Sequence, residues 1–225
     1  MLSPAVEDYL KAVFVLQTDL EDPSGAVSTS SLADRLGISP ASVTSMLKRL
    51  DTLNLATWTS YKGVRLTNAG ETIALEIIRH HRLLETYLRE VMGYDWEQMH
   101  AEAEHLEHHI SEEFEDQLDR MLGFPTHDPH GDPIPGRDGS MVLIASEPLP
   151  ECPLDQPLVI RRVTDTDTAM LGELEAAGLL PGTSLVIKGR ETPDAWRVAL
   201  EGQHVQVADR LAQHVFASEW TETDS

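Results

Sequence analysis

The sequence contains a single cysteine, Cys152, so an intrachain disulfide and a cysteine-cluster zinc site are both excluded. No apolar run approaches the ~20 residues that a membrane-spanning helix needs. The first residues lack the basic start, apolar core and cleavage site of a secretory peptide. HExxH, the motif of many zinc hydrolases, does not occur. We therefore expect a cytoplasmic protein that binds no membrane and uses no such catalytic zinc.

Positive charge is scarce: 17 Lys and Arg stand against 38 Asp and Glu, which gives a net charge of −21. Taken over the whole chain, this balance argues against binding to nucleic acid. The distribution is uneven, however, because residues 35–65 hold five basic side chains and one acidic one, Asp51. A polyanion would have to bind in that short basic segment.

The first segment, residues 1–75, has the pattern of a winged helix-turn-helix. Ser3-Pro4 predicts the start of a first helix, and 27–54 reads as two short helices around a turn that Gly37 permits. Two short strands should follow, joined by a basic hairpin tip at 60–63. The alternative is a packing unit of the same shape with no DNA role, but the turn residues and the basic tip favour DNA binding.

The second helix of that pair would enter the major groove of double-stranded operator DNA, because its exposed side chains are small or basic. The residues predicted to face bases or phosphates are Ser39, Pro40, Ala41, Ser42, Thr44, Ser45, Lys48 and Arg49 on the helix, with Tyr61 and Lys62 at the tip.

The stretch 100–116 (HAEAEHLEHHISEEFED) combines four histidines with seven carboxylates. A helix over its whole length would place Glu104, Glu107 and His108 on one face, at the edge of an apolar stripe that runs from Met99 to Met121. A run of acid on a helix is usually only a solvated face. Here the adjoining stripe favours a metal site, with a further ligand from another helix.

A long helix starting near Asn68, which we expect to cap it, is apolar on more than one face and predicts packing in a homodimer. His81 and Glu85 lie one turn apart on it and form, with His100, a second candidate ligand set. Imidazole and carboxylate ligands without a thiolate suit Mn²⁺ or Fe²⁺ better than Cu⁺ or structural zinc.

The C-terminal part begins with connections rich in Pro, Gly and Asp at 127–139 and 147–157. From Leu158 onwards, five short strands and one helical insert predict a small SH3-like β-barrel. Asp165 and Asp167 would be solvated loop residues more readily than metal ligands. The fold class is thus a mainly α N-terminal winged helix-turn-helix (1–75), a helical metal-binding and dimerisation domain (76–145), and a linker with the SH3-like domain (146–225).

Three segments, HRLLE (81–85), HAEAEHLEHH (100–109) and HGDPIPG (130–136), resemble the diphtheria toxin repressor family of metal-dependent repressors, and its manganese transport regulators in particular. The resemblance covers essentially the whole chain and implies dimers that bind a palindromic operator. It implies a primary metal site of Asp8, Glu104, Glu107 and His108, and an ancillary site of His81, Glu85 and His100.

The resemblance also bears on the choice of metal. Iron-responsive members have Met where Asp8 stands and Cys where Glu104 stands, and two carboxylates in place of two sulfur ligands favour the harder Mn²⁺. Some short manganese regulators have Glu where this chain has Lys11, and a cation one turn from Asp8 does not fit their two-metal site.

We therefore expect a manganese-dependent transcriptional repressor, not an enzyme. A metal shared by Asp8 and the 104–108 segment would fix the DNA-binding heads, whereas uncompensated carboxylates would repel one another without metal. An iron(II)-dependent repressor is the alternative within the family. A metal buffer protein and a metal-dependent hydrolase are the alternatives outside it. The operator sequence, the target genes and the choice between repression and activation do not follow from the sequence.

Overall fold

The structure is a computed structural model that describes residues 2–18, 20, 22, 24–164 and 168–221. The chain forms two compact units. The first consists of Met1–His81, Glu107–Ile110 and Pro135–Ser140, and the second of Arg82–Leu106, Ser111–Ile134 and Met141–Ser225. Within the described residues, no helix is both long and apolar enough to cross a membrane.

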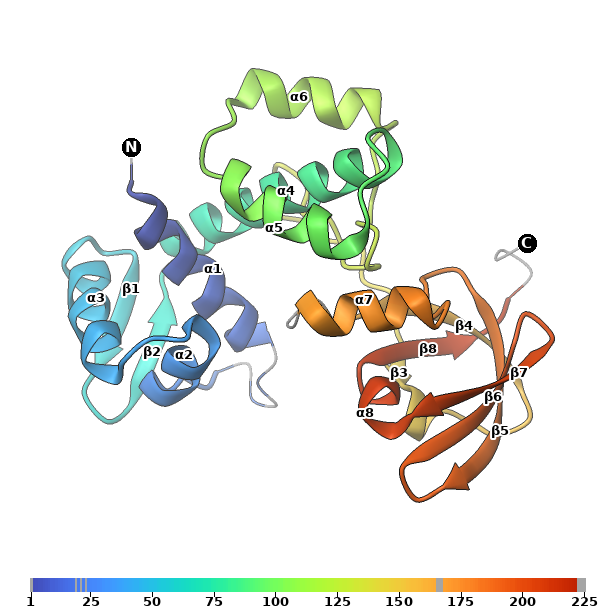
Figure 1. The fold of residues 1–225 in the computed structure, drawn as a ribbon. Helices are drawn as coiled ribbons and strands as arrows, with labels where there is room; N and C mark the ends of the chain where they lie inside the picture. The colour runs from blue at the N-terminus through green and yellow to red at the C-terminus, as the bar shows by residue number, and fades with distance from the viewer. Residues whose placement is uncertain (1, 19, 21, 23, 165–167, 222–225) are drawn as a thin grey trace. The chain divides into compact units, whose positions relative to one another are not determined.

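The first unit contains the predicted winged helix-turn-helix (Figure 1). Its three N-terminal helices are α1 (Pro4–Thr18), α2 (Thr29–Leu36) and α3 (Pro40–Thr52). Gly37, at φ 64°, ends α2 in the left-handed conformation that glycine adopts without strain. Ser39 then caps α3 by accepting a hydrogen bond from the Ser42 amide, and Pro40 opens the helix. Local sequence signals therefore fix the angle between the two helices.

The wing is an antiparallel pair, β1 (Ala56–Thr59) and β2 (Gly63–Leu66). The amide of Val27 donates to the Val64 carbonyl at 2.9 Å, and the reciprocal bond has the same length, so the wing is tied to the segment before α2. This close approach requires a glycine at 63, where a Cβ would lie 2.5 Å from the Val27 carbonyl oxygen.

Helix α4 (Asn68–Glu90) begins in the first unit and continues into the second. The prediction that Asn68 caps it is wrong. Asn68 is already the first helical residue, and the hydroxyl of Thr67 accepts the hydrogen bond from the Gly70 amide at 3.2 Å. A threonine one position earlier provides the same chemistry, so the prediction missed by one residue.

The single long helix expected over 100–116 is also wrong. The structure has α5 (Trp96–Leu106) and α6 (Glu112–Met121), and Ser111 caps α6 by accepting from the Phe114 amide. Met99 and Ala103 of the predicted stripe are buried, but Phe114 and Met121 are 46% and 59% exposed. Apolar steps of three and four continue through both helices, so the periodicity conceals the break between them.

The C-terminal part of the second unit is a six-stranded antiparallel sheet in the order β3-β8-β4-β5-β6-β7 (Figure 1). Strands β4, β5, β6 and β7 contain four of the five predicted strands, and β8 begins one residue after the start of the fifth, which was predicted at 214–216. The bounds are β3 (Glu147–Pro148), β4 (Pro157–Val163), β5 (Ser184–Thr192), β6 (Ala195–Leu200), β7 (Gln203–Ala208) and β8 (Val215–Glu219), with η1 (Leu149–Glu151), α7 (Thr168–Ala176) and α8 (Asp209–Ala212) between them. Because β3 and β7 do not pair with each other in the described residues, the SH3-like domain is an open sheet and not the closed barrel that was predicted.

The sheet and the helices of the second unit are joined by specific contacts. The amide of Trp96 in α5 donates to Glu175 in α7 at 3.1 Å, and Arg89 forms an ion pair with the same carboxylate at 2.7 Å. The amide of Val163 in β4 donates to the His130 carbonyl at 2.8 Å. The strand therefore supports the loop that carries His130.

Candidate metal centre

Asp8, Glu107 and His108 gather at one point in the first unit. Nε2 of His108 lies 2.9 Å from an Asp8 oxygen and 3.5 Å from Oε1 of Glu107. One ligand atom from each of the three residues lies within 4.8 Å of the other two. Asp8 comes from α1, whereas Glu107 and His108 lie in the turn after α5, so the break in the predicted long helix creates this arrangement.

Glu107 is the first residue after α5 and is held by contacts from α1 and α4. Nδ1 of His81 lies 2.5 Å from Oε2 of Glu107, and Nδ1 of His80 lies 3.1 Å from its backbone carbonyl oxygen. The ammonium of Lys11 lies 2.8 Å from Oε2 and 3.1 Å from Oε1. Three side chains thus bind this residue: His80 provides a partner for its backbone carbonyl beyond the end of the helix, and His81 and Lys11 hold its carboxylate.

The Glu107 carboxyl is ionised. Burial raises its pKa, since only 2% of the side chain is exposed, but the hydrogen bond from His81 and the charges of His81 and Lys11 outweigh burial. The resulting pKa is about 2, below the ordinary 4.5. The expectation of uncompensated carboxylates in the metal-free protein is therefore wrong for Glu107, because Lys11 neutralises it.

Glu7 is a functional candidate that the sequence did not reveal. Its Oε2 lies 2.7 Å from Nδ1 of His108, on the opposite side of the ring from Asp8. A carboxylate on the second nitrogen of a metal-ligating histidine fixes the ring orientation and makes the ligating nitrogen more basic. Glu7 directly precedes Asp8 in the sequence, but no spacing rule links it to His108, which is 101 positions away.

Glu104 is the one member of the predicted primary set that the described structure does not bring into this group. It is exposed on α5, whereas the group consists of Asp8, Glu107 and His108. Its place in the primary set was implied by the family resemblance and by a helix that would continue to Glu107, whereas α5 ends at Leu106.

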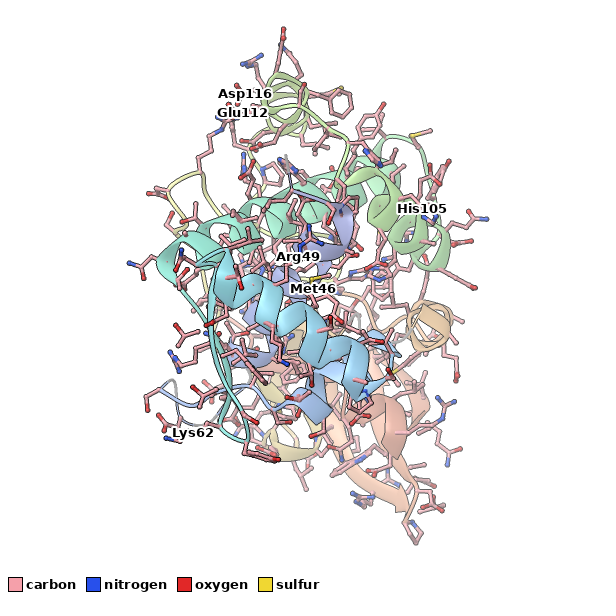
Figure 2. The ribbon with its side chains drawn as sticks, turned by 90° about the vertical axis from the view of Figure 1, so that its left-hand side faces the viewer. Met46, Arg49, Lys62, His105, Glu112 and Asp116 are labelled. Atoms are coloured by element: carbon pink, nitrogen blue, oxygen red, sulfur yellow. The ribbon has the colours of Figure 1, made fainter. Side chains whose placement is uncertain are left out.

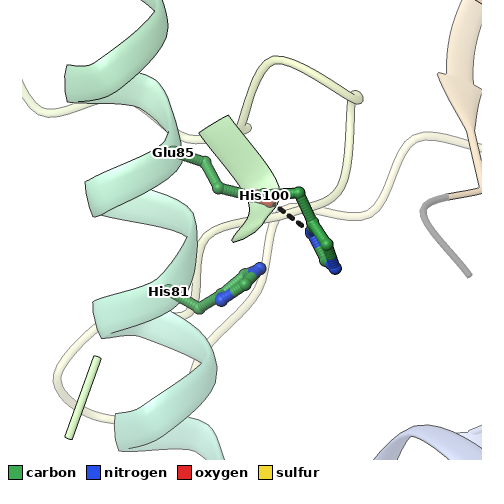
Figure 3. Close-up of side chains that lie close together, drawn as sticks. All are labelled: His81, Glu85 and His100. Atoms are coloured by element: carbon green, nitrogen blue, oxygen red, sulfur yellow. Dashed lines mark hydrogen bonds and ion pairs between the residues drawn. The ribbon is translucent and has the colours of Figure 1, made fainter. Parts of the chain in front are cut away.

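A second group forms around Glu85. Nδ1 of His100 lies 2.8 Å from Oε1 of this fully buried carboxylate, and His81 lies one turn earlier on α4 (Figure 3). Each of the three residues offers one ligand atom within 4.8 Å of the others. The predicted ancillary set is therefore brought together, with α4 itself positioning His81 relative to Glu85.

The structure adds two residues near Glu85 that the sequence analysis treated as part of a linker. Glu85, Asp128 and His130 also offer ligand atoms within 4.8 Å of one another, and all three are buried. Oε2 of Glu85 lies 3.7 Å from Nδ1 of His130. The imidazole of His130 packs edge-on against Trp96 at 4.9 Å between ring centroids. The high content of His and Asp in 127–132 is the sequence feature that could have indicated Asp128 and His130 as candidate ligands.

Asp128 also organises its own loop. Its Oδ1 accepts hydrogen bonds from the amides of His130 and Asp132, both at 2.9 Å, while Oδ2 lies 3.4 Å from Arg82. The loop is thereby held with its two acidic residues inside the protein. Asp165 and Asp167, the other candidates in this part of the chain, lie outside the described residues.

The donor atoms of these groups fit a divalent cation. Each group combines imidazole nitrogen with carboxylate oxygen and contains at least one buried carboxylate. No thiolate takes part, and Cys152 is buried elsewhere, where burial raises the pKa of its thiol. Such sets suit Mn²⁺ or Fe²⁺.

The predicted DNA-facing residues lie on α3 and at the tip of the wing. Of those on α3 and at its cap, all except Thr44 are exposed, and Tyr61 and Lys62 are exposed at the tip. Figure 2 shows Arg49 on α3 and Lys62 on the wing. The hydroxyls of Ser39 and Thr44 are used within the helix, because Ser39 accepts from the Ser42 amide and Thr44 donates to the Pro40 carbonyl. Lys48, Arg49 and Lys62 supply positive charge to this surface.

Between α3 and the wing lies a hollow of about 560 Å³. Its lining includes the hydroxyls of Ser28, Thr29 and Ser30, the lysines Lys48 and Lys62, and Trp58. The Lys48 ammonium lies 5.9 Å from the centroid of the Trp58 ring. Hydroxyl and ammonium donors around one hollow are the groups that bind backbone phosphates.

Three family descriptions match the chain in sequence. "Iron dependent repressor, N-terminal DNA binding domain" matches residues 1–64 and "Iron dependent repressor, metal binding and dimerisation domain" matches 67–136. "FeoA domain" matches 147–219. A DNA-binding part, a metal-binding and dimerisation part and a FeoA part in this order define a metal-dependent transcriptional regulator.

Individual proteins agree with this class. The chain is 30% identical over 199 residues to the "Iron-dependent repressor IdeR" of Mycobacterium leprae, covering 83% of this chain and 85% of the relative. It is 34% identical over 111 residues to the "HTH-type transcriptional regulator MntR" of Bacillus subtilis, covering 49% of this chain and 75% of the relative.

Among solved structures, a "Manganese-dependent transcriptional repressor complex with manganese" superimposes with a TM-score of 0.85 at 34% identity. The match covers 96% of this chain and all of that one. This chain belongs to the iron-dependent repressor family, also called the diphtheria toxin repressor family. Its relatives are transcriptional repressors.

Proposed function

We propose that this protein is a Mn²⁺-dependent repressor that binds a palindromic operator as a homodimer. The observation that carries the proposal is the group formed by Asp8, Glu107 and His108, which joins the first helix of the DNA-binding part to the turn after α5. A bound divalent cation would supply the positive charge that lets both carboxylates and the imidazole share one point.

The residues of the site would act by holding α1. Asp8 would anchor the helix, the buried Glu107 would provide a permanent negative charge, and Glu7 would orient the His108 ring. Because α1 packs with α2 and the wing, holding it restricts the whole DNA-binding part. A dimer whose two DNA-binding parts are restricted loses less conformational entropy when it binds two half-sites about one helical turn apart.

The residues around Glu85 would hold a second ion. His81 and His100 form one candidate set with Glu85, and Asp128 and His130 form another. Glu85 is common to both sets, so we propose that it is a ligand whichever set binds the ion. Its Oε1 lies next to His100 and its Oε2 next to His130, so one carboxylate borders both sets.

The choice of Mn²⁺ over Fe²⁺ is supported by the carboxylate of Asp8 and by the manganese-bound structural relative, while IdeR supports the iron alternative. Parallel anaerobic titrations with the two ions, read by binding to the same duplex, separate these possibilities. Equal half-saturation by iron would remove the case for manganese specificity.

The function itself is tested without knowing the operator. A pool of random double-stranded DNA is selected by the protein with Mn²⁺ and, separately, with chelator. We expect an inverted repeat to be enriched only with Mn²⁺, and Asp8→Ala to lose that enrichment while Asp155→Ala, in an exposed ion pair of the second unit, retains it. Mn²⁺ binding with no metal-dependent selection of DNA would instead identify a metal buffer.

A further inference from the structure

Lys11 lies one helical turn after Asp8 on α1 and binds the buried carboxylate of the candidate metal centre. Its ammonium is 2.8 Å from Oε2 of Glu107 and 3.1 Å from Oε1. Oε1 is the oxygen that also lies 3.5 Å from Nε2 of His108. The lysine and an ion held by Asp8, Glu107 and His108 would therefore share one carboxylate.

Because this ion pair is buried, sharing of the Glu107 carboxylate between Lys11 and a metal ion would have a large electrostatic effect. The side chain of Lys11 is 18% exposed and that of Glu107 is 2% exposed, so water screens their charges poorly. The ion pair between Lys188 and Asp155 has a similar distance of 2.9 Å but lies in water, with side chains 34% and 71% exposed. An exposed pair of that kind contributes little to stability.

The Lys11–Glu107 pair also links α1 to the turn after α5 without any metal. Asp8 and Lys11 are on the same helix, so an ammonium on Glu107 holds α1 in nearly the place where a shared cation would hold it. The two positive charges are not equivalent, because the ammonium of Lys11 is an ion-pair partner of Glu107, whereas a metal ion would be coordinated by Glu107, Asp8 and His108 together.

We propose that Lys11 is an internal counter-cation for Glu107 that raises the metal concentration at which the site fills and keeps α1 partly docked when no metal is bound. This inference rests on the proposed function, because it concerns the regulation of the same metal centre. Through this contact, Lys11 determines the metal concentration at which the repressor responds.

The test uses Lys11→Met, which keeps the length of the side chain and removes the charge, and Lys11→Arg, which keeps the charge. Lys188→Met is the matched control, because it removes one charge from a solvent-exposed pair. Mn²⁺ affinity is measured without DNA from the loss of the free-ion electron paramagnetic resonance signal. We expect Lys11→Met to bind Mn²⁺ about tenfold or more tightly, the lower end of what a nearby unit charge does to an ionic equilibrium, and the other two variants to match the wild type.

A second measurement does not depend on metal binding or on DNA. In chelator, Lys11→Met, Glu107→Gln and the double variant form a cycle of thermal unfolding experiments. We expect Lys11→Met to lower the melting temperature and the two substitutions to be strongly coupled, because the ammonium and the carboxylate stabilise each other only when both are present.

The outcomes are distinct. Unchanged or weaker Mn²⁺ binding by folded Lys11→Met overturns the competition between lysine and metal. Additive effects in the unfolding cycle overturn the docking of α1 by the lysine. If the wild type fails to bind Mn²⁺ at all, the proposed function fails, whereas the unfolding cycle still decides whether Lys11 is the counter-cation of Glu107.

Discussion

The carboxylate of Glu7 provides a graded test of how the candidate metal centre is held. Its side chain is 13% exposed and that of His108 is 8% exposed, so their 2.7 Å contact is largely shielded from water. Outer partners of metal-ligating histidines are typically worth 10–100-fold in metal affinity, which corresponds to about 1.4–2.7 kcal/mol.

The two substitutions Glu7→Gln and Glu7→Ala should differ within that range. Glutamine keeps an oxygen that accepts the hydrogen bond from His108 but loses the negative charge, so we expect Mn²⁺ affinity to fall about tenfold. Alanine removes the acceptor as well and leaves the ring without its second fixed contact, so we expect a loss of about 100-fold.

The assay is a Mn²⁺ titration read from the electron paramagnetic resonance signal of the free ion, with Glu90→Gln as control, because Glu90 is an exposed residue at the end of α4. A melting curve in chelator establishes that each variant is folded. If both folded Glu7 variants bind Mn²⁺ as the wild type does, Glu7 does not orient a metal ligand.

Further predictions address the second ion, the wing, the DNA surface and the pH dependence of stability. His130→Ala, which removes a buried imidazole beside Glu85, should abolish one class of bound Mn²⁺ in calorimetric titration and leave the class that depends on Asp8; loss of both classes would contradict two separate sites. Gly63→Ala places a Cβ 2.5 Å from the Val27 carbonyl at a φ of 100°, so urea unfolding should show a destabilisation of about 2 kcal/mol or more; a neutral result would mean that the wing moves away at no cost. Lys48→Ala and Lys62→Ala should each weaken binding to every duplex alike and reduce the salt dependence by about one counterion, whereas loss of binding to one sequence only would assign them to base contacts. Burial raises the pKa of Glu107, but the His81 hydrogen bond and the charges of His81 and Lys11 lower it from 4.5 to about 2. A depressed folded-state pKa means that its stabilisation is fully present above pH 4.5 and is lost as the pH falls towards 2, so the stability advantage of wild type over Glu107→Gln in chelator should shrink in urea titrations taken from neutral pH to about pH 3.

The winged helix-turn-helix was predictable because its signals are local. Gly37 and Ser39-Pro40 act through their own backbone conformation and their own hydrogen bonds, and the structure has the turn and the cap where the sequence places them. The strands from Leu158 onwards were predictable for the same reason, since a short run rich in Leu, Val and Ile between turn residues is a local signal of a strand. Closure of the sheet is a long-range property, and there the prediction of a barrel was wrong.

The metal centre was predictable only in part. Asp8 came from the family resemblance and not from its spacing, while Glu107 and His108 were recognised as neighbours of the right chemistry. Glu7 and Lys11 lie within one turn of Asp8, yet their contacts with His108 and Glu107 cross about 100 positions of sequence. No local pattern encodes such a distance.

The sequence by itself determined which ligand chemistry is available: imidazole and carboxylate, a lone cysteine and a basic segment in an acidic chain. Only the tertiary structure decided which of these groups meet. Hydrogen bonds from His80, His81 and Lys11 hold Glu107 just beyond the end of α5 and connect it to α4 and α1, while Glu104 is exposed on α5. The reason is energetic, because a buried carboxylate needs charged and hydrogen-bonding partners, and those partners come from parts of the chain that only folding brings together.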